Sequence, residues 1–156
     1  MPAETRDNAG VIAFPPLIFA VHAVAGGVAH WLCPIPLLPP WPARIAGVLL
    51  AIAAASLVTW AKRSMERAGT NIKPSLPTTA IVAAGPYRYT RNPMYLSLCM
   101  LHLGLGLLLN GTLAVLFLVP LALTLHFGVI KREERYLAAK FGEPYLAYQR
   151  HVRRWI

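Results

Sequence analysis

Arginine and tyrosine side chains gather over residues 85–95, where a basic segment of the chain meets an apolar one. Asn92-Pro93 has the form of a helix start, because asparagine caps helices well and proline fits the first helical position. The free N–H groups of such a helix, with Arg88 and Arg91 beside them, favour a carboxylate or a phosphate. The same residues equally suit a membrane anchor, in which arginine and tyrosine hold the helix end at headgroup level. Both interpretations are open at this stretch.

Two lines of polar, small and apolar residues follow at helical spacing. They are Tyr95, Cys99, His102 and Gly106, and then Leu123, His126, Ile130 and Glu133. Because residues three or four apart lie on one helix face, two such lines facing each other would enclose a polar cleft. Ionisable residues inside a membrane are functional candidates, although both histidines equally suit a hydrogen bond within the helix bundle.

Glu133 and Glu134 are adjacent carboxylates at the end of the last apolar segment. Neighbouring side chains on a helix point about 100° apart, so at most one of the two can face a cleft. The other then faces solvent or an arginine. We therefore expect the two glutamates to have unequal roles, although both also suit simple surface ion pairs of little energetic value.

The composition is that of an integral membrane protein. Of the 156 residues, 56% are hydrophobic and only 13% are charged, and the mean hydropathy is +0.51, values that an ordinary soluble domain does not have. The net charge of +9 raises the question of nucleic acid. The basic residues stand in two blocks beside apolar segments, however, so we expect an anionic membrane surface and no nucleic-acid partner. Cys33 and Cys99 make neither a disulfide framework nor a metal-ligand cluster, and we expect no metal.

Four apolar runs predict an all-α, polytopic membrane protein that forms a single domain over residues 1–156. Residues 14–61 would form an N-terminal helical hairpin, with its helices at about 14–33 and 43–61. Residues 94–130 would form a C-terminal hairpin with a tight turn at Asn110-Gly111. The second helix is rich in small residues and is expected to pack against the first. Residues 1–13 are expected to be a disordered lead.

The charged segments predict the orientation. Six lysines and arginines fall between Lys62 and Arg91 and seven fall from Lys131 onward, so residues 62–93 and 131–156 are expected on the cytoplasmic side. Four spans then place both termini in the cytoplasm, and we expect a prokaryotic inner membrane. The proline-rich turn before residue 43 and the turn at Asn110 would lie together on the opposite side.

From about Gly69 to the C-terminus the sequence resembles the superfamily of isoprenylcysteine carboxyl methyltransferases and phospholipid N-methyltransferases. The resemblance is carried by the combination and order of several short motifs. These are Gly85-Pro86-Tyr87-Arg88, Arg91-Asn92-Pro93-Met94-Tyr95, Gly104-Leu105-Gly106, Glu133-Glu134, residues 141–148 with the sequence Phe-Gly-Glu-Pro-Tyr-Leu-Ala-Tyr, and Val152-Arg153-Arg154-Trp155.

The resemblance implies an S-adenosylmethionine-dependent methyltransferase that binds this cofactor at the cytoplasmic ends of the last two helices, beneath the 131–156 tail. Aromatic faces and a glutamate suit the sulfonium, and an arginine suits the cofactor's carboxylate. The implied catalytic residues are Arg91, His126 and Glu133. The implied cofactor-binding residues are Tyr95, His102, Gly104, Gly106, Glu133, Glu134, Tyr145, Tyr148 and Arg154.

The expected reaction is methyl transfer to a lipophilic acceptor, a carboxylate or an amine, at the membrane interface. Members of the superfamily that act on prenylated cysteine have histidine where this chain has Asn92, so a mechanism that uses that histidine does not transfer to this chain. The alternative from another class is a membrane accessory or assembly protein that keeps the fold without turnover. The sequence leaves the acceptor and the oligomeric state open.

Overall fold

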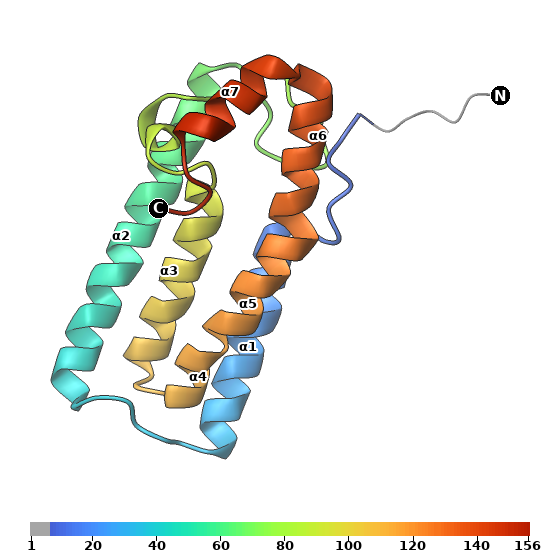
Figure 1. The fold of residues 1–156 in the computed structure, drawn as a ribbon. Coiled ribbons are helices and arrows are strands. Elements are labelled where there is room, and N and C mark those ends of the chain that lie inside the picture. Colours follow the sequence, from blue (N-terminus) through green and yellow to red (C-terminus); the bar gives the residue numbers. More distant parts are fainter. Residues whose placement is uncertain (1–6) are drawn as a thin grey trace.

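The computed structural model describes residues 7–156, and within this range the regular secondary structure is helical, with one isolated bridge between Pro36 and Gly111. The helices form an elongated bundle, with α7 lying across one end (Figure 1). Their bounds are α1 Pro15–Leu32, α2 Pro40–Arg67, η1 Gly85–Arg88, α3 Pro93–Leu108, α4 Thr112–Leu116, α5 Leu118–Leu125, η2 His126–Ile130, α6 Lys131–Phe141 and α7 Glu143–His151.

Three of these helical segments are long and apolar enough to cross a membrane: Pro15–Leu32, Pro40–Arg67 and the continuous rod Thr112–Phe141 that comprises α4 to α6. The third apolar run of the sequence forms α3, a shorter apolar helix of 16 residues. The predicted all-helical membrane class is therefore confirmed. The predicted count of four spans stays a prediction, because α3 is shorter than the usual span of about 20 residues.

The second helix is longer at both ends than the apolar run that predicted it. It begins at Pro40 rather than at residue 43, because prolines are tolerated in a first helical turn, where N–H groups have no intrahelical partner. It continues to Arg67, so Lys62, Arg63 and Arg67 lie on its last two turns. Gly69, at φ +67°, follows its end, where the left-handed backbone favours glycine.

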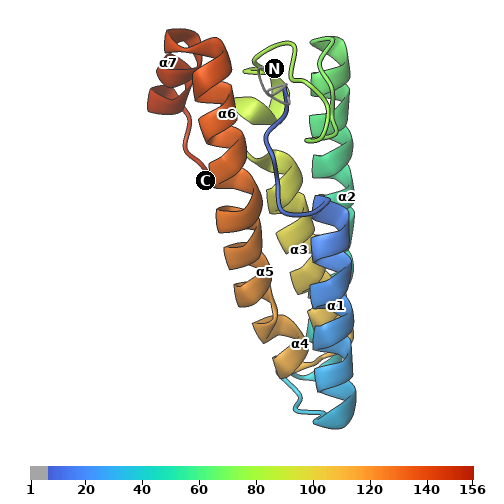
Figure 2. The ribbon, with the colours of Figure 1, turned by 90° about the vertical axis from the view of Figure 1, so that its right-hand side faces the viewer.

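The partner of α2 is α3, which corrects the expectation that α2 packs against α1. Glycines allow the contact: a Cβ added at Gly47 would lie 2.7 Å from the carbonyl oxygen of Gly104, and one at Gly104 would lie 3.0 Å from that of Gly47. The small residues of α2 thus serve a helix distant in sequence, while α1 packs against α4 and α5 (Figures 1 and 2).

The two turns at the far end of the bundle meet, as the sequence predicted. The side chain of Asn110, whose own φ is +52°, accepts hydrogen bonds from the backbone N–H groups of Leu37 and Leu38 at 3.2 and 3.0 Å. The backbone N–H of Thr112 donates to the carbonyl of Ile35 at 2.9 Å. These bonds tie the proline-rich connection to the α3–α4 turn.

The rod from α4 to α6 is irregular in two places. Its helical pattern breaks at Phe117, between α4 and α5, because Pro120 has no N–H to donate to the carbonyl four residues earlier. Residues His126–Ile130 then form a π-helical turn, η2, which the sequence did not predict. A π turn holds one residue more than an α turn. Each residue beyond it therefore lies one position later in the helical repeat than it would in an unbroken α-helix.

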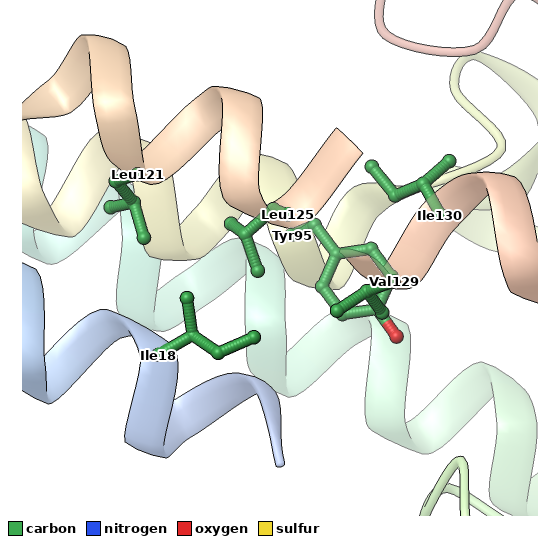
Figure 3. Close-up of a cluster of buried hydrophobic side chains, with 6 residues drawn as sticks. All are labelled: Ile18, Tyr95, Leu121, Leu125, Val129 and Ile130. Carbon is green, nitrogen blue, oxygen red and sulfur yellow. The ribbon is translucent and has the colours of Figure 1, made fainter. Parts of the chain in front are cut away.

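The apolar core lies between α1, α3 and the α5–η2 segment. Figure 3 shows Ile18, Tyr95 and Leu125 meeting there, with Leu121, Val129 and Ile130 on the same rod. The ring of Tyr95 belongs to this core, whereas its hydroxyl extends from it toward the polar end of the bundle. The core thereby fixes the position of a side chain that chemistry can use.

The N-terminal segment is ordered where the structure describes it, which corrects the expected disordered lead over residues 7–13; residues 1–6 lie outside the described range. The backbone N–H of Ile12 donates to Gly128 at 3.2 Å, and Arg132 donates to the carbonyl of Gly10 at 2.9 Å. Asp7 accepts from Lys140 at 2.6 Å. This strap, residues 7–14, runs along α6 (Figure 2).

Candidate active site

A cavity of about 120 Å³ lies at the basic end of the bundle, opposite the turns at residues 37 and 110. One part of its wall is apolar and comes from α2, from the segment 70–82 and from α6. The other part is polar and aromatic and comes from η1, α3, α6 and α7. The polar lining residues are Tyr87, Arg91, Asn92, Tyr95, Glu133, Tyr136, Tyr145 and Tyr148, with Thr70, Asn71, Lys73 and Thr78 from the loop.

Glu133 and Tyr95 meet at the base of this cavity. The Tyr95 hydroxyl donates a hydrogen bond of 2.6 Å to Oε1 of Glu133. One member of each helical line thus meets the other at this end of the bundle, whereas Leu123, on the second line, is exposed. A carboxylate held by a buried phenol is restricted in its rotation and presents its remaining oxygen lone pairs to the cavity.

Three further tyrosines surround the polar part of the cavity. The Tyr148 hydroxyl donates to the backbone carbonyl of Tyr87 at 2.8 Å, and the Tyr145 and Tyr148 rings lie 6.1 Å apart. Burial raises the pKa of Tyr87, Tyr145 and Tyr148 above its usual value. All three phenols are therefore neutral at physiological pH and offer ring faces, which attract cations.

Arg91 and Arg154 both form salt bridges with Glu134, on the opposite side of α6 from Glu133. The Glu134 carboxylate lies 3.1 Å from Nη1 of Arg91 and accepts from Nε and Nη2 of Arg154 at 2.9 and 2.7 Å. The side chains of Arg91 and Glu134 are each 11% exposed. Adjacent carboxylates therefore do different things, as predicted from their angular separation: Glu133 lines the cavity and Glu134 holds arginines.

The C-terminal segment is fastened to the chain just before α3. The backbone N–H of Arg91 donates to the carbonyl of Arg153 at 2.9 Å, and the side chain of Asn92 donates to the carbonyl of Arg154 at 2.9 Å. Asn92 occupies the N-cap position of α3 and Pro93 begins the helix, as predicted, but the Asn92 side chain makes no cap hydrogen bond. Its side-chain amide instead joins the C-terminal segment to the start of α3. This is a tertiary contact, which local preferences for helix ends do not predict.

The remaining predicted residues lie away from the cavity. His102 is buried and makes a hydrogen bond of 3.0 Å with the carbonyl of Ala114. Gly104 packs against α2, and a Cβ at Gly106 would lie 2.8 Å from Val115. The His126 ring lies against that of Phe127 at 4.8 Å. Roles for these four residues in cofactor binding or catalysis stay predictions that the cavity's geometry does not support.

Sequence reasoning left out Tyr87 and the apolar wall. The available signal for Tyr87 was its place in the Gly-Pro-Tyr-Arg motif. Tyr136 was also missed: its hydroxyl donates to Asp7 at 2.7 Å and accepts from the backbone N–H of Thr78 at 3.2 Å. No pattern in the sequence pairs residue 136 with residues 7 and 78.

These features define a class of protein. It is an all-helical membrane protein whose cavity is lined by aromatic and carboxylate side chains and lies beneath a folded-back C-terminal tail. The sequence model of the family described as Phospholipid methyltransferase matches residues 42–144. This match spans more than half of the chain, so the chain belongs to the phospholipid methyltransferase family. It is thus assigned to methyltransferases of the membrane with lipid-type substrates, which confirms the family expected from the sequence motifs.

A relative is found in Haemophilus influenzae. This protein, described as uncharacterized, is 43% identical to the present chain over 63 residues, which are 40% of this chain and 100% of the relative. The identity supports common descent over that part of the chain. Its description assigns no activity.

Proposed function

We propose that this protein transfers a methyl group from S-adenosylmethionine to a lipophilic acceptor in the membrane, with the cavity at the basic end as its active site. One observation carries the proposal: Tyr95, Glu133, Arg91, Tyr145 and Tyr148 line a single cavity although they come from three helices and a loop. Family membership supports a methyltransferase with a lipid-type substrate.

The lining residues fit the proposed cofactor. Bound S-adenosylmethionine supplies an electrophilic methyl group on a positively charged sulfur. The faces of Tyr145 and Tyr148 and the carboxylate of Glu133 suit that positive charge. Arg91 suits a carboxylate, and its buried Nε has no hydrogen-bond partner among residues 7–156, which leaves a donor for an anionic group to satisfy.

The cavity must widen to admit such a ligand. Its volume of about 120 Å³ is below the ~300 Å³ at which pockets for drug-sized ligands begin. The segment 70–82 is the wall best able to move, because it has no helix of its own, although the Thr78 N–H bond to Tyr136 restrains it. We therefore place entry of ligands on the side of this segment.

The chain's own residues position the reactants and hold protons. The acceptor atom must approach the methyl carbon to within about 3 Å in line with its bond to sulfur, and the cavity walls impose that approach. A carboxylate acceptor needs no base, whereas a protonated amine must first lose a proton. Of the histidine and glutamate side chains on the two helical lines, Glu133 lines the cavity while His102 and His126 do not. We assign the role of base for an amine to Glu133.

The membrane arrangement follows from the charges. We propose that α3 is the fourth span, that the basic end faces the cytoplasm and that both termini lie there, in a prokaryotic inner membrane. This orientation gives a water-soluble methyl donor access from the cytoplasm and a lipophilic acceptor access from the bilayer.

The test measures cofactor binding and methyl transfer separately. Purified protein in lipid nanodiscs is expected to bind S-adenosylmethionine in calorimetry, and Glu133→Gln is expected to weaken this affinity about tenfold, the equivalent of ~1.4 kcal/mol. Glu143→Gln is the control, because Glu143 is exposed, pairs with Arg150 and does not line the cavity. Membranes given a labelled methyl donor should then yield labelled lipid.

Absence of binding at physiological cofactor concentrations contradicts the proposal and supports the accessory-protein alternative. Binding without label in the lipid fraction would keep the cofactor site and reject the lipophilic acceptor. Equal affinities for Glu133→Gln and the native protein would remove Glu133 from the site.

A further inference from the structure

A second hollow of about 380 Å³ opens between α6 and the C-terminal segments, on the face of α6 away from the candidate active site. It is lined by Phe127, Lys131, Glu134, Arg135, Ala138, Gln149 and Arg154. No lining residue is shared with the cavity that contains Glu133. The two hollows are therefore separate sites on opposite sides of one helix.

The charge in this hollow is positive. It contains three cations and one carboxylate, a net of +2. The carboxylate is Glu134, and Arg154 and Arg91 already neutralise it, with contacts of 2.7 and 3.1 Å. Lys131 and Arg135 are exposed, and neither forms a side-chain salt bridge among the described residues. Within the described part of the chain the hollow therefore offers an anion two basic side chains that have no carboxylate partner, with the Lys131 ammonium 4.8 Å from the centre of the Phe127 ring.

An apolar stripe leads directly into the hollow. Leu123 and Phe127 are 52% and 57% exposed, and Lys131 and Arg135 continue the same line at steps of four residues. In an α-helix, residues four apart differ by about 40° in direction around the axis, so a line of such residues gradually rotates around the helix. The π turn η2 lies within this line, and its extra residue reduces that rotation. Both apolar side chains and both basic side chains therefore lie on one face of the rod.

The lengths match one leaflet of a bilayer. Half of a ~30 Å hydrocarbon core is about 15 Å, or about ten residues of helix at 1.5 Å each. If Lys131 stands at the membrane surface, the middle of the bilayer lies near Leu121, ten residues earlier. Leu123 and Phe127 then lie at the depth of the acyl chains, and the headgroup of the same lipid would reach Lys131 and Arg135. The hollow gives that headgroup a second wall, formed by Gln149 and Arg154.

We infer that this groove, comprising Leu123, Phe127, Lys131, Arg135 and Arg154, binds one anionic phospholipid, with its phosphate in the basic hollow and an acyl chain along α5. The occupant is a lipid rather than free phosphate because the apolar stripe runs continuously into the charges. The inference goes beyond the proposed methyl transfer and does not depend on it. The lipid is a structural ligand here, distinct from the methyl acceptor.

Native mass spectrometry tests the inference. Detergent-solubilised full-length protein is offered equal amounts of phosphatidylglycerol and phosphatidylcholine with identical acyl chains. The native protein should retain phosphatidylglycerol preferentially, and Lys131→Gln/Arg135→Gln should reduce that preference by about fivefold or more. Lys62→Gln/Arg63→Gln removes the same charge from exposed residues on α2 at the same end and should leave the preference within about twofold.

Three outcomes overturn the inference. They are equal retention of both lipids by the native protein, an equal loss of preference in the two double variants, and displacement of phosphatidylglycerol by millimolar inorganic phosphate, which would make the hollow a phosphate site. Circular dichroism of both double variants checks that the helices are retained. Phe127→Ser should weaken both lipids without changing the preference between them, and an altered preference would contradict the placement of the acyl chain.

Discussion

At the scale of single residues, the contrast between Glu133 and Glu134 organises the candidate active site. Glu133 receives the hydroxyl of Tyr95 and lines the cavity. Glu134 lies on the other side of α6 and receives two guanidinium groups. Because Arg91 also lines the cavity, Glu134 acts on the site through Arg91. We therefore regard Glu134 as a positioning residue rather than a cofactor-binding one.

Replacing Glu134 with glutamine should separate these roles. The amide keeps the shape but leaves two guanidinium groups without their charged partner, so we expect a loss of stability of about 1–3 kcal/mol and a weaker apparent affinity for the methyl donor. Thermal unfolding and the donor's KM are the measurements. A raised KM with an almost unchanged kcat is expected.

The conservative change Glu134→Asp should restore part of the lost affinity, because a carboxylate remains to hold the arginines. If Glu134→Gln lowers kcat at unchanged KM, Glu134 acts on the reacting groups directly, and the positioning role is contradicted.

At the scale of the elements, the contact between α2 and α3 determines the distance between two walls of the cavity. α2 supplies Met65 to the cavity and α3 supplies Tyr95, and the two helices approach closely at Gly47 and Gly104. Without a side chain at either glycine the backbones can come into contact, which is how small residues associate helices in membranes. The glycines therefore act on the site from a distance by setting the spacing of the helices.

Gly47→Ala should consequently destabilise the protein. Its Cβ would lie 2.7 Å from a backbone oxygen, so the helices must separate, and we expect a cost of about 1–3 kcal/mol. Gly27→Ala is a matched control within α1, because a Cβ there meets nothing within 4 Å. Unfolding midpoints in the same detergent make the comparison, and equal midpoints for the two variants would contradict the close contact of α2 and α3.

The strap over residues 7–14 should loosen in acid. The Lys140 ammonium and then the Tyr136 hydroxyl hold the pKa of Asp7 below its ordinary value. A carboxylate with a lowered folded-state pKa stabilises its contact at neutral pH and loses that contribution as the pH falls below about 4. Hydrogen exchange at Ile12, corrected for the intrinsic rate, should therefore rise in acid.

Asp7→Asn should show the raised exchange at neutral pH and should remove its dependence on acid. Exchange at Ile12 that is the same at neutral and acidic pH in the native protein would show that Asp7 does not hold the strap.

At the scale of the whole molecule, the proposed orientation has a direct consequence for labelling. Cys33 is exposed at the end of the bundle opposite the basic segments. In intact cells, a membrane-impermeant maleimide should label Cys33 in a Cys99→Ala background. In a protein without other cysteines it should not label Arg150→Cys until the cells are broken. The reverse pattern would invert the topology, and labelling of both from outside would remove one span.

The sequence predicted the class of the molecule better than the pairing of its parts. Hydrophobic runs and blocks of charge are local properties, so the helical membrane class and the meeting of the turns near Leu37 and Asn110 followed from them. The pairing of α2 with α3 did not, because Gly47 and Gly104 are 57 positions apart in the chain and small residues do not name their partner. The meeting of Tyr95 with Glu133 could be anticipated because the sequence placed both at the same end of the bundle, and their roles in the site stay predictions.

The π turn at His126–Ile130 has an implication for how the chain tolerates a change of length. A π turn is an α-helix that carries one residue too many, with the helix on either side left in its original phase. Deleting one amino acid within this turn would relax it to an ordinary α-helix and keep Glu133 directed at Tyr95. A one-residue deletion between the turn and Glu133 would rotate that carboxylate by about 100° around the helix axis, away from the cavity.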